Sequence, residues 1–357
     1  MRAKFNKAKI SGIQVCIPSL CVDIDECLDE LFDGNTKTLQ RTKKILGLQK
    51  RYISTSEISV TDLAYIASSK LLSSLKVDKD SINTLIFVTQ TPDFFMPSCA
   101  NYLHGKLNLN INTIAFDINQ ACAGYLYGLF LAYSFIENGN ANKILLICGD
   151  TLTKTINKQD LKNAPIFGDG VSATLIENGE SESFFDLHSL GKGFDRLIIP
   201  QGAFADIYTK EVNNSDLFCV DNTRSLENLY MDGTEIFNQA LKLEVESTKK
   251  ILDFACKSYE DVDYFLFHQS NKFLVESIAS ELNIVNEKVP NFLMEKYANL
   301  SGCSLPALLC ELNQNNFNAT LSAFGAGYSW GSAYLKFDKD LKTYPITFYK
   351  GEKNDKK

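Results

Sequence analysis

Short apolar segments rich in β-branched residues alternate along the chain with longer segments of helical spacing. Four of the apolar segments predict buried strands, at residues 82–89, 113–117, 143–148 and 264–267. Residues 61–72 have the apolar spacing of a helix, with Thr61 as the N-cap candidate. A long amphipathic helix is predicted at 233–255 and a shorter one at 271–282. Strands that alternate with helices predict an α/β architecture.

Two segments depart from this alternation. Residues 183–226 show no regular period and contain glycines, a proline and a polar run at 213–216, so we expect a long irregular excursion between two halves of the protein. Such an excursion would cover a pocket or contact a partner. Residues 321–337 hold three glycines between two strand-like segments, which predicts a backbone that another group approaches closely.

Cys122 lies where a predicted strand passes into a predicted helix. The strand ends at Asp117, and residues 122–136 have helical apolar spacing that ends with Gly139 as the C-cap. Free N–H groups and the positive dipole at a helix start favour the thiolate, so a lowered pKa is predicted for Cys122. A nucleophile and a buried structural cysteine both fit this position on its own.

Composition and charge exclude several classes of function. The 357 residues are 45% hydrophobic and carry a net charge of −7, whereas a general nucleic-acid binder presents a basic face. The longest apolar run, at 126–135, is too short to span a bilayer, and the first residues lack the pattern of a secretion signal. We therefore expect a cytoplasmic protein with no membrane segment. Ten cysteines without a CxxC pair and three scattered histidines predict neither a disulfide framework nor a metal site.

A cysteine that accepts acyl groups needs a proton relay and donors for the oxyanion. Among the three histidines, His104 lies in a helical stretch and His188 in the irregular excursion. His268 directly follows the strand at 264–267 and is the best placed, although such a histidine is often structural. Asn299 is beside Ser and Gly, where asparagine is by default a turn residue, yet its amide can donate to a carbonyl oxygen.

Five separate segments carry a resemblance to a known family. They are Asp-Ile-Asn-Gln-Ala-Cys-Ala-Gly at 117–124, Phe-Gly-Asp-Gly at 167–170, His-Gln-Ser-Asn at 268–271, Tyr-Ala-Asn-Leu-Ser-Gly-Cys-Ser-Leu-Pro at 297–306, and Phe-Gly-Ala-Gly-Tyr-Ser-Trp-Gly-Ser at 324–332. Because these five motifs occur in this order, the chain resembles the β-ketoacyl-acyl-carrier-protein synthase III family. The resemblance implies a thiolase-like, five-layered α-β-α-β-α fold of two similar halves, residues 1–180 with the cysteine and 181–357 with the histidine and asparagine.

The resemblance also implies an acyltransferase with a Cys122–His268–Asn299 triad. Cys122 would take an acyl group from acyl-coenzyme A, and decarboxylative condensation with malonyl-acyl carrier protein or malonyl-coenzyme A would give a 3-oxoacyl thioester. His268 and Asn299, with Asn271 nearby, would hold the donor thioester. The N–H groups of Cys122 and Gly327 would form the oxyanion hole. Coenzyme A thioesters are then substrates, and no tightly bound cofactor is implied. The reaction would serve fatty-acid initiation or a specialised side pathway.

The family resemblance further implies a homodimer. Met96, the residue before Pro97, would reach into the acyl pocket of the partner subunit. Phe94 belongs to the same predicted pocket.

Some positions depart from the family pattern. Members that prime fatty-acid synthesis hold the adenine end of coenzyme A with a tryptophan and an arginine, but the only tryptophan here is Trp330. Phe273 stands where the family often has a carrier-docking arginine, although Lys272 is adjacent. These changes predict a specialised paralogue with altered donor recognition.

Related chemistries need residues that this chain lacks. A hydroxymethylglutaryl-coenzyme A synthase needs a carboxylate where residues 89–91 are Thr-Gln-Thr, and a degradative thiolase needs a second cysteine within 324–332. Two alternatives stay open. One is an acyltransferase of the same type that acylates an alcohol or amine without forming a carbon–carbon bond. The other is a non-catalytic partner subunit of a synthase heterodimer, although such subunits usually lose the cysteine or histidine.

Overall fold

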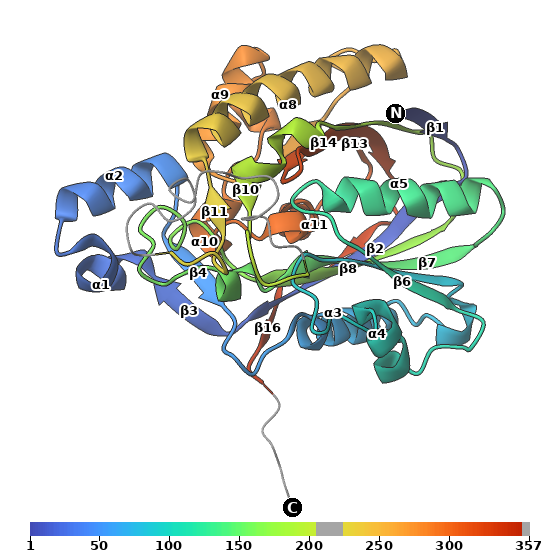
Figure 1. Ribbon diagram of the computed structural model, residues 1–357. Coiled ribbons are helices and arrows are strands. Elements are labelled where there is room, and N and C mark those ends of the chain that lie inside the picture. Colours follow the sequence, from blue (N-terminus) through green and yellow to red (C-terminus); the bar gives the residue numbers. More distant parts are fainter. Residues whose placement is uncertain (205–223, 352–357) are drawn as a thin grey trace, which may run out of the picture.

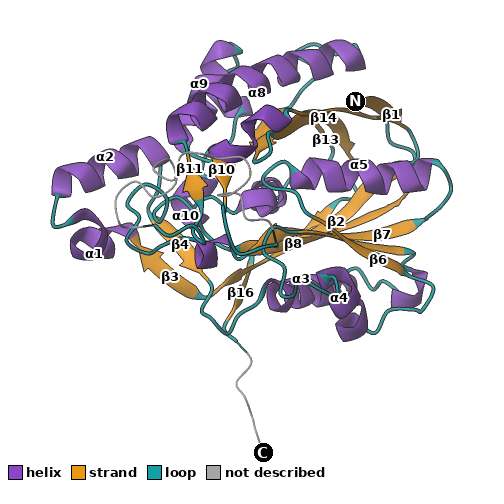
Figure 2. Ribbon diagram, in the orientation of Figure 1, coloured by secondary structure: helices purple, strands orange, loops and turns teal. Residues whose placement is uncertain are grey.

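Two β-sheets with helices outside and between them form five layers (Figure 1). The computed structural model describes residues 1–204 and 224–351. Helices and strands alternate along most of this length, so the predicted α/β class and its five layers are confirmed. Figure 2 shows the two sheets in orange with helix α5 between them.

The first sheet contains most strands of the N-terminal half. Its order is β15 (Lys342–Thr343), β2 (Ala8–Pro18), β8 (Gly170–Asn178), β7 (Lys143–Asp150), β5 (Thr84–Val88) and β6 (Ile114–Ile118), and β16 (Thr347–Tyr349) also pairs with β2. Strand β5 is apolar and buried along its whole length, as a parallel strand covered on both faces requires. Strand β6 was predicted to be buried but lies at the sheet edge, with Ile114 exposed.

The second sheet contains mainly strands of the C-terminal half. Its order is β1 (Arg2–Phe5), β9 (Ser183–Ser189), β14 (Ser329–Phe337), β13 (Phe317–Gly325) and β12 (Tyr264–Phe267). The halves exchange end strands, because β1 pairs with β9 while β15 and β16 pair with β2. The boundary predicted at residue 180 falls between β8 and β9 and stays a prediction.

Three pairs of helices complete the layers. The outer face of the first sheet carries α3 (Val60–Ser74) and α4 (Cys99–Leu107), the central layer holds α5 (Gly124–Glu137) and α11 (Ser304–Leu312), and α8 (Gly233–Ala255) and α9 (Lys272–Glu281) lie on the second sheet. Helix α5 can lie close to the first sheet because Gly128 faces it. A Cβ atom there would be 2.6 Å from Leu146 Cδ1.

Shorter elements flank the layers. They are β3 (Leu20–Asp23), α1 (Leu28–Phe32), α2 (Thr36–Leu46), β4 (Lys50–Ile53), β10 (Leu197–Ile198), β11 (Tyr230–Met231) and α10 (Leu293–Tyr297). No helix within the described ranges has the length and apolar character to cross a membrane. The cytoplasmic location stays a prediction.

Several details of the sequence interpretation were wrong. Helix α3 begins after Ser59, whose hydroxyl accepts from Asp62 N–H while Asp62 accepts from Ser59 N–H, so Ser59 and not Thr61 is the N-cap. The irregular excursion starts later than predicted, because residues 183–189 form β9. His188 is therefore a strand residue, with Nε2 3.0 Å from Asp186 Oδ1. The polar run at 213–216 lies outside the described residues.

Candidate active site

Cys122 lies in the turn between β6 and α5, two residues before the helix begins. Its side chain is buried, and its Sγ is 3.9 Å from Ser301 Oγ. The turn is packed from two sides. A Cβ atom at Gly302 would lie 3.4 Å from Ala121 O, and one at Gly325 would lie 2.9 Å from Cys122 N. The predicted cysteine is thus held where segments of both halves meet.

The electrostatics of Cys122 differ from the sequence prediction. Burial raises the pKa of its thiol to about 12, the hydrogen bond with Ser301 acts in the opposite direction, and the charges of Asp150 and Glu244 raise it further. The predicted lowering of the pKa by the helix start is therefore wrong. Loss of hydration outweighs a few backbone dipoles when the sulfur is buried. The resting form is the thiol, and its proton has to leave as the sulfur attacks.

Asn299 lies beside this cysteine through Ser301. Its Oδ1 accepts from Ser301 N–H at 2.8 Å, and its own backbone N–H donates to Ile166 O at 3.0 Å. These bonds fix the side chain with its Nδ2 group directed away from Ser301. Within the described ranges no acceptor takes the Nδ2 hydrogens, so they remain for a ligand oxygen.

His268 follows strand β12 and is held by the next strand. Its backbone N–H donates to Ser322 O of β13 at 2.8 Å. The imidazole is 3% exposed, and neither ring nitrogen has a partner among residues 1–204 and 224–351. Burial lowers the pKa of His268 to about 4, so the ring is neutral at physiological pH. A neutral imidazole has one nitrogen to accept a proton and one to donate.

The glycine motif approaches Cys122 at a different residue from the one predicted. A Cβ atom at Gly325 would lie 2.9 Å from Cys122 N and 3.2 Å from Ala123 N. The three atoms nearest to such a Cβ at Gly327 all belong to Ser329. Gly325 therefore makes the close contact with the Cys122 backbone. The glycine-rich segment 321–337 predicted such a contact, but not which glycine makes it. The oxyanion role of Gly327 stays a prediction.

Replacing Gly325 with alanine should move the backbone of Cys122. The added methyl cannot stay 2.9 Å from a backbone nitrogen, so the predicted oxyanion donor is displaced. We expect acylation of Cys122 to slow by about 10²–10³, measured by intact-mass spectrometry over time. Gly105→Ala is the matched control, because nothing lies within 4 Å of its Cβ position. Equal rates for both variants would contradict the expectation.

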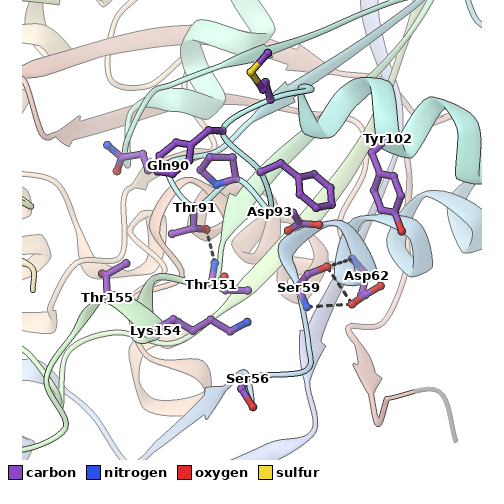
Figure 3. A pocket seen from close by; sticks show the side chains of 14 residues that line it. Ser56, Ser59, Asp62, Gln90, Thr91, Asp93, Tyr102, Thr151, Lys154 and Thr155 are labelled. Carbon is purple, nitrogen blue, oxygen red and sulfur yellow. Dashed lines mark hydrogen bonds between the residues drawn. The ribbon is translucent and has the colours of Figure 1, made fainter. Parts of the chain in front are cut away.

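Phe94 and Met96 line a hollow of about 930 Å³ (Figure 3). Thr151 N–H donates to Thr91 Oγ1 at 2.8 Å, and Figure 3 shows these two lining residues joined by a dashed line. The two residues lie together, as predicted, but none of the three triad residues lines this hollow. Their part in an acyl pocket stays a prediction.

A second hollow of about 390 Å³ reaches Asn299. Asn271 also lines it, and the Asn271 side chain caps α9 by accepting from Leu274 N–H at 2.7 Å. Phe237 and Phe273 stack on its wall with ring centroids 5.5 Å apart. Phe273, which stands where the family often has an arginine, is thus an apolar part of the wall of the hollow that Asn299 also lines.

The other titratable groups do not form a competing site. His104 Nε2 lies 3.0 Å from Asn110 O, and the described cysteines are all free thiols. No group of three metal-binding side chains occurs in the described part of the chain.

Comparison with known proteins assigns the chain to a family. The family model of 3-oxoacyl-[acyl-carrier-protein] synthase III matches residues 116–193, and the model of its C-terminal part matches residues 252–337. A β-ketoacyl-[acyl-carrier-protein] synthase III of Clostridium perfringens is 35% identical over 338 residues, which cover 92% of this chain and 99% of that protein. The chain belongs to the 3-oxoacyl-[acyl-carrier-protein] synthase III family.

Two further synthase III relatives match over nearly their whole length. A Campylobacter jejuni protein, whose own name as a 3-oxoacyl-[acyl-carrier-protein] synthase 3 is provisional, is 55% identical over 359 residues, covering 99% of this chain and 100% of that one. The crystal structure of a 3-oxoacyl-(acyl-carrier protein) synthase from Burkholderia xenovorans has a TM-score of 0.90 and 32% identity, covering 98% of this chain and 99% of the other. The predicted thiolase-like fold is confirmed, and this synthase III is an acyl-transferring condensing enzyme.

Proposed function

We propose that this synthase takes an acyl group from acyl-coenzyme A onto Cys122 and condenses it with a malonyl thioester on acyl carrier protein or coenzyme A. The products are a 3-oxoacyl thioester, free coenzyme A and carbon dioxide. One observation carries the proposal. The buried thiol of Cys122 lies beside Ser301, whose N–H donates to the Asn299 side chain. The buried His268 imidazole, without a partner among the described residues, follows β12, which pairs with β13, and Gly325 of β13 approaches the Cys122 backbone.

The first half-reaction forms the acyl-enzyme. The Cys122 sulfur attacks the thioester carbonyl, and its proton moves to the neutral His268. His268 then gives this proton to the leaving coenzyme A thiolate, which departs as a thiol. The raised pKa of Cys122 supports this order, because the thiol cannot lose its proton before a base is in place. Backbone N–H groups beside the sulfur stabilise the oxyanion.

The second half-reaction uses the same imidazole as a donor. His268 and Asn299 Nδ2 donate hydrogen bonds to the thioester carbonyl oxygen of the malonyl group. Loss of carbon dioxide leaves an enolate whose charge these donors stabilise. The enolate carbon attacks the acyl group on Cys122, the sulfur leaves as a thiolate, and a proton from solvent restores the thiol. Asn271, at the start of α9, lines the path that the donor follows.

A two-step assay tests this function. The protein is first exposed to a panel of acyl-coenzyme A thioesters and then to malonyl-carrier protein, with carbon dioxide and the 3-oxoacyl product measured. Condensation predicts both products in equal amounts. An acyl adduct that passes to an amine or alcohol without release of carbon dioxide would favour simple acyl transfer. No adduct with any donor would favour a non-catalytic partner subunit.

The hollow at Asn299 supports a specialised acyl side pathway over fatty-acid initiation. Phe273 is an exposed aromatic on the wall of the hollow at Asn299, where the family often has an arginine. An apolar rim weakens electrostatic capture of an ordinary acidic carrier. Elongation of acetyl-coenzyme A with malonyl-carrier protein at ordinary rates would refute this specialisation.

A homodimer would cover exposed apolar side chains in the connection from β5 to α4. Phe95 and Met96 are 75% and 84% exposed, and β6, which pairs with β5, is the edge strand of the first sheet. We propose that two copies meet here and that Met96 enters the partner's acyl pocket.

Met96→Glu should weaken this dimer. An unpaired charge at a central contact costs about 2 kcal/mol, which raises the dimer Kd about thirtyfold. Analytical ultracentrifugation measures the change. Val285→Glu, on an exposed apolar residue at the start of a short 3₁₀ turn, is the control and should leave the dimer intact. A monomeric wild-type protein would refute the proposal.

A further inference from the structure

Helix α8 places an acidic side chain on its buried face. The buried positions of this helix follow helical spacing: Ala240, Glu244, Ser247, Thr248, Ile251, Leu252 and Ala255. Glu244 is 1% exposed and stands where an apolar residue is expected. Its neighbours one turn away are small, namely Ala240, Ser247 and Thr248, so space for a carboxyl group lies between the helix and the second sheet.

A cluster of serine hydroxyls meets this carboxyl group. Ser322 and Ser332 face each other across β13 and β14, with their Oγ atoms 3.1 Å apart, and Ser332 Oγ lies 2.9 Å from Ser247 Oγ. The Ser322 hydroxyl hydrogen-bonds to the Glu244 carboxyl. Glu244 Oε2 has no partner among the described residues, and no described cation pairs with it. Burying a carboxyl group without a cation is costly, and buried acids of this kind are typical of functional sites.

Strand β13 connects this cluster to the active site. Ser322 O accepts the backbone N–H of His268 at 2.8 Å, and Gly325, three residues further along, contacts the backbone of Cys122. Three residues of a strand span roughly 10 Å. One strand therefore contacts Glu244, His268 and Cys122 within that length.

We propose that Glu244 is a positioning residue that acts through Cys122, neutral while the sulfur is acylated and, once ionised, holding Cys122 in the thiol form. The proposal rests on the proposed role of Cys122 as the nucleophile.

The directions of the proton equilibria agree with this role. Burial raises the pKa of Glu244 to about 8, and the hydrogen bond from Ser322 acts against it. The charge of Glu244, when present, raises the pKa of Cys122. Below about pH 8 the carboxyl group is neutral and adds no charge. Above that pH its negative charge opposes the thiolate.

Other ionisable groups near these residues have partners or lie away from the cluster. Those on the elements packed against α8 are Tyr334 and Lys336 on β14, Asp186 and His188 on β9, and Lys272, Glu276 and Glu281 on α9, whereas β13 carries none. Asp186 pairs with His188 at 3.0 Å and with Arg2 at 3.4 Å. Asp150 is the other acid whose charge reaches Cys122, and it accepts from Thr89 Oγ1 at 3.0 Å.

Alkylation of Cys122 by iodoacetamide tests the proposal without any acyl substrate. Rates are measured between about pH 6 and pH 10 by mass spectrometry of the peptide that contains Cys122, for the wild type and Glu244→Gln. We expect equal rates near pH 6.5. Near pH 9.5 the variant should react about threefold to tenfold faster, because one pKa unit is a tenfold change in thiolate. Glu246→Gln, on the same helix with its partner Lys250 at 3.3 Å, is the control and should follow the wild type.

A purely structural Glu244 predicts a different result. The ratio of variant to wild-type rates would then be the same at every pH, and this outcome would overturn the proposal. If Glu244→Gln does not fold, the wild type alone decides. The logarithm of its rate should rise with a slope of one, flatten around pH 8 and rise again, whereas an unbroken line refutes the role of Glu244. Absence of an acyl adduct on Cys122 would instead refute the proposed function.

Discussion

Replacing Cys122 with alanine should remove all acyl-enzyme formation. The wild-type mass should increase by one acyl group after exposure to its acyl-coenzyme A substrate, and the variant mass should not change. Condensation should fall by at least about 10⁴, because loss of a covalent nucleophile removes the pathway and not one contact within it. The measurements are intact-mass spectrometry and release of carbon dioxide.

Cys310→Ala is the matched control for this experiment. Cys310 is also a buried free thiol, in α11, where its Sγ lies 3.7 Å from Ile13 O. This variant should keep the wild-type mass increase. An adduct that persists in Cys122→Ala and disappears in Cys310→Ala would show that the nucleophile has been assigned to the wrong residue.

Asn299→Asp should separate the two half-reactions. Aspartate retains an oxygen that can accept Ser301 N–H, so the turn beside Cys122 is kept, but the Nδ2 hydrogens are lost. We expect near-normal acylation of Cys122 and a fall of about 10²–10³ in condensation. A negative charge beside the enolate adds to the loss. Single-turnover measurements of the acyl adduct and of carbon dioxide follow the two steps separately.

Asn291→Asp serves as a control for the change of amide to acid. Asn291 is half-buried, lies between α9 and α10, and donates from Nδ2 to Lys272 O at 3.2 Å. Its substitution should leave both half-reactions unchanged. Loss of acylation in Asn299→Asp would mean that Asn299 supports the cysteine turn and not the malonyl group.

The elements that follow from local pattern were predicted well. Residues 233–255 form α8 with the predicted bounds, and 264–267 form β12, because sustained amphipathic spacing indicates a helix and an apolar run of four residues has the length of a strand. Strand β9 was missed because Asp186 and His188 interrupt its apolar pattern. These side chains are tolerated in a strand because Asp186 pairs with His188 and also with Arg2, which lies on the neighbouring strand β1. No local window contains that information.

The sequence predicted which residues belong to the candidate site better than it predicted their pKa values. The five motifs singled out Cys122, His268 and Asn299, and the structure links Cys122 and Asn299 through Ser301, whereas the shared role of the three residues stays a prediction. The pKa direction of Cys122 was wrong because burial and the charges of Asp150 and Glu244 depend on tertiary packing. Glu244 did leave a signal in the sequence, as a lone acid within the apolar stripe of α8.

Strand β13 has a consequence for how this enzyme can diversify. The backbone of this strand contacts both predicted catalytic segments: Ser322 O accepts the His268 N–H, and Gly325 packs against the Cys122 backbone. Their spacing is thus fixed by hydrogen-bonded strands and not by a loop. Substitutions at Phe273, on a separate element that lines the hollow at Asn299, can therefore change the fit of a donor while the spacing of the two segments is inherited unchanged.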